Sequence, residues 1–320
     1  MPALELAVLG LAAVAVPHLL PQRSLPPILG VWMWFTALML RASIVVGGVA
    51  VILFVAPSTW QFASLSDWCL HTVVPYLSTH LGLDGHAIGH LAVFIPALVL
   101  VAVLASVTIE LVRTSRRLLR WIETTSLGPG PEGSHIVGGS AVLLATTGLL
   151  RPKLLVSAGA LVSLSDRELR AGLAHERGHL RRGHRFFATA SVTLHRCARI
   201  VPGSGRAFEW LHFHLERDAD EYACRTTRDP EGLAGAIAAA AGADRAPLPM
   251  PALGIANGSV AARLEALTEP RSWHPAAAGA AGVVIAISSI AAVGALAAVP
   301  VLVLSGAVDA QIPIANLFTC

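Results

Sequence analysis

The sequence has few charged residues for its length. Lys, Arg, Asp and Glu make up 13% of the 320 residues, whereas hydrophobic residues make up 54% and the mean hydropathy is +0.65. This balance is typical of a membrane protein with a modest soluble portion. The formal net charge of +3 is too small to indicate direct nucleic-acid binding.

Cysteines are also scarce, and no two of them form a CxxC pair. Their spacing argues against a disulfide framework and against a cysteine zinc site, so we expect small buried thiols. A disulfide between Cys69 and Cys320 is left open. The four cysteines are Cys69, Cys197, Cys224 and Cys320.

The apolar residues gather in four runs, each long enough to cross about 30 Å of hydrocarbon as a helix. The first run lacks the positive n-region and the A-x-A site of a signal peptide, so we expect it to be retained as a span. Arg41 lies inside the second run, where we expect it to snorkel or to pair with another span rather than to act in a functional site. The runs lie at about 3–20, 28–56, 89–112 and 276–304.

Positive charges are distributed unevenly between these runs. The loop 57–88 has no Lys or Arg, whereas four arginines fall within 113–120. Because Lys and Arg concentrate on the cytoplasmic side, the sequence predicts a multi-pass plasma-membrane protein with its N-terminus outside. The expected organisation is a membrane domain at 1–112 with three spans, a cytoplasmic domain at 113–275, and a fourth span with a short outer tail at 276–320.

The pattern within 113–275 predicts a small α+β domain. Turn residues, short apolar runs and helix caps define its elements. They are a loop at 128–131, a hairpin of 135–137 and 141–146 closed by Gly138-Gly139, a strand at 154–157, a helix between Ser165 and Gly183, and helices at about 206–225, after Pro230, and at about 259–268.

Residues 175–179 read His-Glu-Arg-Gly-His, which is the HExxH pattern. On a helix, residues i and i+4 share a face, so both imidazoles can reach one ion, and Glu176 is placed to act on a water held there. Ser165 and Glu168 predict a capping box, and Gly183 predicts the helix stop. The motif is therefore expected in the middle of a helix.

A catalytic zinc site usually has three protein ligands, so a third ligand is needed. Glu216 is favoured, because Glu216 and Asp220 form E-x-x-x-D on one face of a predicted helix. Asp220 is then expected to hold the free nitrogen of a ligating histidine. The alternative is an acidic patch on a solvated helix. The histidines considered and not favoured are His184, whose spacing is one short of the metzincin pattern, and His195, His212 and His214, which have no accompanying motif.

The predicted site holds one Zn²⁺ per chain through His175, His179 and Glu216. Zinc would activate water and polarise a peptide carbonyl, while Glu176 takes the proton and passes it to the leaving amine. An exposed edge of the strand at 154–157 is expected to hold substrate backbone. The candidates for stabilising the oxyanion are His212, Tyr222 and Arg263.

The chain resembles membrane-embedded gluzincin peptidases in its motif runs. Two related families share these runs: the HtpX and CAAX-protease type, and the BlaR/MecR type of antirepressor protease. The resemblance implies the same three zinc ligands and the same catalytic glutamate, and it covers about 152–268. The runs are Pro152–Ser157, Leu164–Leu169, Leu173–His179, Glu216–Asp220 and Ala262–Leu267.

The plan of spans is more similar to the BlaR/MecR type. Those proteins carry an extracellular penicillin-binding sensor after the last span, whereas here only residues 305–320 follow it. Sensing is therefore expected from the 57–88 loop, from the spans or from a separate sensor protein. The resemblance implies a winged-helix repressor, cut in the cytoplasm, as the substrate.

We therefore expect a mainly α, polytopic membrane protein with about four transmembrane helices and a cytoplasmic α+β gluzincin-like zinc protease domain. The expected function is cleavage of a BlaI/MecI-like repressor in signal-dependent regulation, with β-lactam or cell-wall stress as the signal. An HtpX-like quality-control protease is the first alternative. A non-catalytic scaffold or sensor with structural zinc is the second, and the intact Glu176 argues against it. The expected partners are the protein substrate, the lipid bilayer and a homo-oligomer or sensor protein, without direct nucleic-acid contact.

Overall fold

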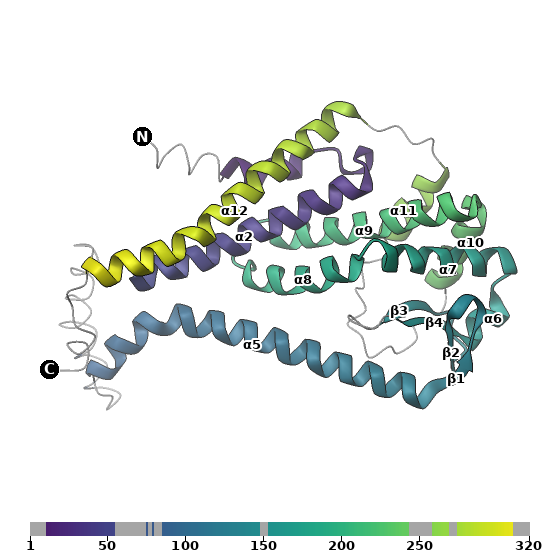
Figure 1. Ribbon diagram of the computed structural model, residues 1–320, viewed down its shortest axis with the longest axis horizontal. Helices are drawn as coiled ribbons and strands as arrows, with labels where there is room; N and C mark the ends of the chain where they lie inside the picture. Colours follow the sequence, from purple (N-terminus) through teal and green to yellow (C-terminus); the bar gives the residue numbers. More distant parts are fainter. Residues whose placement is uncertain are drawn as a thin grey trace.

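A computed structural model describes residues 11–54, 85–147, 153–242, 258–268 and 274–309, together with Pro75 and Thr79. Most of these residues are helical, and one small sheet is present. In Figure 1 the sheet lies at one end of the molecule, and three long helices extend toward the other end. The long helices are α2 (Pro27–Phe54), α5 (Gly85–Thr125) and α12 (Pro275–Asp309).

Three helices are long and apolar enough to cross a membrane, with candidate spans at Pro27–Val51, Leu98–Thr125 and Pro275–Ala297. They match the second, third and fourth apolar runs of the sequence. The first run, at 3–20, falls partly outside the described residues, and its described end includes the 3-10 helix η1 (Val16–Leu19). The expected outer loop, Cys69 and Cys320 also lie largely outside them. The number of spans and their orientation stay predictions.

Helix α5 is much longer than the span expected at 89–112. It continues through the arginines because its last turns pack against the sheet: Leu118 and Ile122 share a buried cluster with Val137 and Leu155. The arginines are good helix formers and do not interrupt it. The expected domain boundary at residue 112 therefore falls within one continuous helix.

The sheet has four strands in the order β1-β2-β4-β3. Strand β2 runs parallel to β4, whereas the pairs β1–β2 and β3–β4 are antiparallel. The predicted hairpin between 135–137 and 141–146 is therefore wrong, because both segments pair with β4 and not with each other. The predicted loop at 128–131 is also wrong in part, because it overlaps an edge strand. The bounds are β1 (Ser126–Pro129), β2 (His135–Val137), β3 (Leu144–Thr147) and β4 (Lys153–Ser157).

The segment between β2 and β3 is held by the end of β4 instead of forming a tight turn. The Ser157 hydroxyl donates to the carbonyl of Ala141 and accepts from the amide of Leu143. Gly159 follows in α6 (Ala158–Ser163), and a Cβ there would lie 2.1 Å from the Ser140 carbonyl oxygen. The chain passes so close only because Gly159 has no side chain.

The HExxH motif lies on α7 (Asp166–Arg181), as predicted. Its capping box is present: the Ser165 hydroxyl accepts from the Glu168 amide, and the Glu168 carboxylate accepts from the Ser165 amide. The helix is followed by Gly183 in the left-handed conformation, with φ of 66°. That turn leads directly into α8 (His184–Cys197).

Helix α9 (Ser204–Thr227) packs along α7 and carries the predicted third ligand. Gly178 makes this close packing possible, because a Cβ there would lie 3.1 Å from the Cα of Ala219. Small residues at a helix crossing let the two backbones approach. Helices α10 (Pro230–Gly242) and α11 (Gly258–Thr268) then cover the α7–α9 pair (Figure 1).

The α7–α9 unit is joined to the long helices through a buried core. Leu211 and Leu215 of α9 pack with Trp34 and Leu38 of α2. Arg41 of α2 is fully buried and donates to the carbonyls of Ala37 (2.9 Å) and Val14 (2.7 Å). It also contacts His18 Nε2 at 3.0 Å. Its described partners are thus backbone carbonyls and a histidine, and the expected pairing with another span stays a prediction.

Candidate metal centre

Helices α7 and α9 bring three ligand-type side chains together. The Nε2 atoms of His175 and His179 lie 3.1 Å apart, and each is 3.5 Å from a carboxylate oxygen of Glu216. Among the described residues, these three form the group of His, Cys, Asp and Glu side chains that can hold one cation. His175 is buried, and the other two are half-buried.

The spacing of these atoms fits a tetrahedral cation. Zinc lies about 2.0–2.2 Å from histidine nitrogen and carboxylate oxygen. At a tetrahedral angle, two such ligand atoms are about 3.4 Å apart. The two nitrogens are 3.1 Å apart, and each is 3.5 Å from one Glu216 oxygen, Oε2 for His175 and Oε1 for His179, which is close to this spacing. Two nitrogens and one oxygen also form a donor set that zinc accepts, with a fourth position left for water or substrate.

Asp220 lies behind the first of the two histidines. Its Oδ1 is 2.8 Å from His175 Nδ1, although the oxygen lies off the direction of a linear hydrogen bond. Arg263 of α11 donates to both oxygens of Asp220, at 2.7 and 2.8 Å, and reaches Glu216 at 2.8 Å. The guanidinium therefore compensates the charge of two buried or half-buried carboxylates.

His184 lies behind the second histidine. Its Nδ1 is 2.9 Å from His179 Nδ1, and its Nε2 is 2.9 Å from Asp218 Oδ2. The side chains of His184 and Asp218 are 3% and 2% exposed, so no solvent competes for these contacts. His184 is therefore not a third ligand, since it faces the side of His179 opposite to the ligand atom.

Glu176 is held by a residue of the sheet. Thr146 of β3 donates a hydrogen bond of 2.6 Å from its hydroxyl to Glu176 Oε2. Burial raises the pKa of Glu176, and the nearby His175 and the Thr146 hydrogen bond oppose this rise. The carboxylate follows directly after His175 on α7, one of the three ligand-type side chains.

The charges around the ligands set their protonation. Burial lowers the pKa of His179 to about 3, which keeps the ring neutral, with one nitrogen lone pair for a cation. Burial also opposes protonation of His175, but the Asp220 and Glu216 carboxylates close to its two ring nitrogens outweigh it and raise its pKa to about 10. Burial would raise the pKa of Glu216, yet Arg263 and the histidines hold it well below its usual range.

The other predicted candidates lie elsewhere or have other partners. His212 contacts Ser191 Oγ at 3.1 Å, and His214 contacts Gln22 Oε1 at 3.3 Å. His195 stacks on Phe208 of α9. None of the three joins the cluster of ligand-type atoms found among the described residues.

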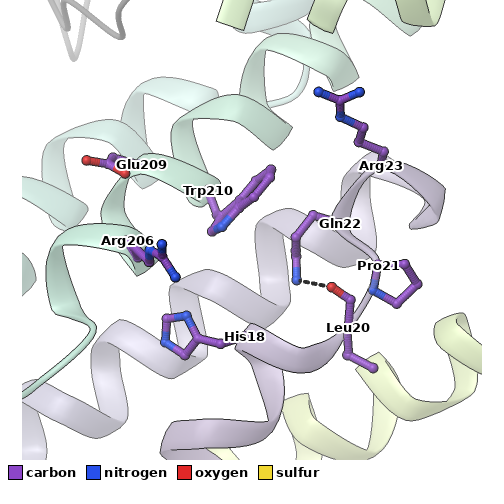
Figure 2. Close-up of a pocket in the computed structure, with 8 residues that line it drawn as sticks. All are labelled: His18, Leu20, Pro21, Gln22, Arg23, Arg206, Glu209 and Trp210. Carbon is purple, nitrogen blue, oxygen red and sulfur yellow. Dashed lines mark hydrogen bonds between the residues drawn. The ribbon is translucent and has the colours of Figure 1, made fainter. Parts of the chain in front are cut away.

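A cleft of about 510 Å³ lies apart from this centre, between residues 18–23 and the first half of α9. Figure 2 shows its basic and aromatic lining, with Gln22 donating to the Leu20 carbonyl. It contains none of the three ligand-type residues or Glu176, so it is not the metal centre. The lining residues are His18, Leu20, Pro21, Gln22, Arg23, Arg206, Glu209 and Trp210.

Three features of the centre were missed in the sequence: the Thr146 contact, the His184–Asp218 pair and the link from Arg263 to two carboxylates. The residues in these contacts are 30 to 47 positions apart in the chain. The one available signal was the position of Asp218 between Glu216 and Asp220 in an acidic run.

No protein-family model matches the chain, and no curated protein matches its sequence. Among solved structures, the crystal structure of S. mikatae Ste24p aligns with a TM-score of 0.33 and 17% sequence identity. The alignment covers 65% of this chain and 65% of that one, which is slightly less than two thirds of its length. The likeness is too distant to bear on activity, so the geometry of the metal centre is the basis for a proposed function.

Proposed function

We propose that the chain is an integral-membrane zinc endopeptidase. The cluster of His175, His179 and Glu216, with ligand atoms 3.1–3.5 Å apart and Glu176 beside it, is the observation that carries the proposal. The three apolar helices support a location in the membrane. One Zn²⁺ per chain is the expected cofactor, because the donor set and spacing suit it.

The chain's own residues would then divide the work of hydrolysis. Bound zinc supplies Lewis-acid polarisation of the peptide carbonyl and activation of water. Glu176 accepts the proton of the attacking water and returns it to the leaving amine. Thr146 holds the carboxylate of Glu176 in place through its 2.6 Å hydrogen bond. Arg263 keeps Glu216 and Asp220 ionised beside the ligands.

We propose β3 as the strand that receives the substrate backbone. The expectation for 154–157 is wrong, because β4 is paired on both sides, with β2 and with β3. Strand β3 is at the end of the sheet and contacts α7, and its Thr146 touches Glu176. A peptide added to β3 would therefore run past the catalytic carboxylate.

We propose a cytoplasmic DNA-binding repressor as the substrate and release of its target genes as the consequence. The plan of spans expected from the sequence, which is more similar to the antirepressor type than to the HtpX type, supports this choice. Cleavage of damaged membrane proteins is the second candidate. A contact of α9 supports it: Arg217, which follows the ligand-type Glu216, donates to the carbonyls of Gln22 and Leu25, just before the candidate span that begins at Pro27.

The test compares cells that carry the native chain with cells that carry Glu176→Gln. Glutamine keeps the size and loses the base, so cleavage should fall by about 10²–10⁴-fold while zinc content is unchanged. Labelling of new N-termini in the proteome would identify the substrate. A few sites in one small DNA-binding protein would support the repressor, whereas many sites in membrane proteins would support quality control. Identical N-termini in both strains, with stress applied, would refute the peptidase.

A further inference from the structure

We infer that His184 and Asp218 are positioning residues that fix the tautomer and the ring orientation of His179. The inference rests on the proposed metal site, since it concerns how one ligand of that site is held. It is independent of the substrate and of the direction of the spans. Neither residue belongs to the three-residue cluster of ligand-type side chains.

The proton positions follow from the chemistry of the three groups. An ionised carboxylate can only accept, so His184 Nε2, which is 2.9 Å from Asp218 Oδ2, must donate. A neutral imidazole with a proton on Nε2 has a lone pair on Nδ1. The Nδ1 of His184 therefore accepts from Nδ1–H of His179, across 2.9 Å.

This sequence of hydrogen bonds leaves His179 with one free lone pair, on Nε2. That atom faces His175 Nε2 at 3.1 Å and Glu216 at 3.5 Å, so the lone pair points into the proposed metal position. A ligating histidine that donates its second N–H to a fixed acceptor binds metal in one tautomer and one orientation. Without His184, the His179 ring could place its proton on Nε2 and lose the lone pair that ligation needs.

The backbone places His179, His184 and Asp218 next to one another. Gly183, at φ of 66°, turns the chain so that His184 opens α8 and folds back on the last turn of α7. Asp218 projects from α9, and its Oδ1 accepts from Arg182 Nη1 at 3.3 Å. The rings of His179 and His184 meet edge to face, with centroids 4.9 Å apart. Three helices therefore converge on one buried contact.

A purely structural role would give a different pattern of substitution effects. A buried His–Asp pair can also serve only to join α8 to α9, in which case the contact with His179 is incidental. Asparagine and glutamine separate the two roles. The amide of Asn reaches the position of Nδ1 and can accept from His179, whereas the longer Gln reaches the position of Nε2 and keeps only Asp218.

The experiment measures zinc affinity by competition with a chromogenic chelator, on the purified full chain in detergent. We expect His184→Gln and His184→Phe to lose about 10- to 100-fold in affinity, the usual effect of removing a partner behind a ligand. His184→Asn should lose less than about 10-fold. The visible spectrum of the cobalt-loaded protein should shift in His184→Gln and return toward the native form in His184→Asn.

Two further variants make the result decisive. His195→Phe, on the same helix but remote from the ligands, should leave the affinity and the cobalt spectrum unchanged, and His175→Ala should abolish binding. If His175→Ala abolishes binding and His184→Gln keeps native affinity and spectrum, the inference is wrong while the proposed metal site stands. If the native chain binds no zinc, both are refuted.

Discussion

Two pairs of histidines are buried in the same group of helices, and they differ in what surrounds them. On α7, His175 and His179 face Glu216, with Asp220 and the His184–Asp218 pair behind them. On α9, the second pair is His212 and His214. The described polar partner of His212 is a serine hydroxyl, and that of His214 is a glutamine carbonyl oxygen.

The difference shows that burial alone does not make a metal centre. Burial lowers the pKa of His212 to about 4 and that of His214 to about 3, so both are neutral core side chains. The Nδ1 of His214 even has no hydrogen-bond partner among the described residues. A centre needs, in addition, converging lone pairs and negative charge, which α9 supplies to α7 through Glu216.

The largest contrast is expected from asparagine substitutions in the two pairs. His175→Asn removes a proposed ligand, so zinc affinity should fall by more than the about 100-fold that loss of an outer partner can cause. His212→Asn should leave affinity within about twofold and lower stability by about 1–3 kcal/mol through a lost buried hydrogen bond. Chelator competition and thermal unfolding of the purified chain measure both effects. Equal losses of zinc affinity in the two variants would show that His175 and His212 do not differ in metal binding.

A second contrast concerns two charged residues of α11. Arg263 is 11% exposed at its side chain and pairs with Glu216 and Asp220, whereas Glu265 pairs with Arg23 in solvent, at 51% and 66% exposure. Removing one partner of a buried pair leaves an uncompensated charge and costs about 3–5 kcal/mol, whereas an exposed pair contributes about 0–1 kcal/mol.

Arg263→Gln should therefore lower the unfolding temperature by on the order of 10 °C, and Arg23→Gln by no more than about 3 °C. Added zinc should restore part of the loss in Arg263→Gln, because a cation replaces the missing positive charge beside Glu216. Scanning fluorimetry with and without zinc measures this. Similar small shifts in both variants would mean that Arg263 does not compensate the carboxylates.

The sequence predicted what is encoded within single helices. The capping box of Ser165 and Glu168 and the stop at Gly183 placed α7 correctly, and period 3.6 put Glu216 and Asp220 on one face. Such features depend on residues three to five positions apart. They are therefore readable without any knowledge of the tertiary structure.

Features that depend on distant contacts were not predicted. The pairing of β2 and β3 with β4 overrode the Gly138-Gly139 turn signal, because Ser157 and Gly159 anchor the connection from far along the chain. The histidine spacing likewise excluded His184 as a ligand without showing that it supports one. Its role depends on Asp218, which is 34 residues away and on another helix.

The smallest expected effect tests the contact between the sheet and the catalytic carboxylate. Thr146→Val keeps the shape and removes the hydroxyl that donates to Glu176, so cleavage should fall by about 5- to 10-fold, which corresponds to one hydrogen bond of about 1–1.5 kcal/mol. Zinc affinity should not change, because Thr146 touches no ligand-type atom of the cluster. Thr146→Ser keeps the hydroxyl and should retain most activity. If valine and serine lower the cleavage rate equally, the hydroxyl has no part in positioning Glu176. The polar contacts that distinguish the α7 histidines from His212 and His214 would then not include β3.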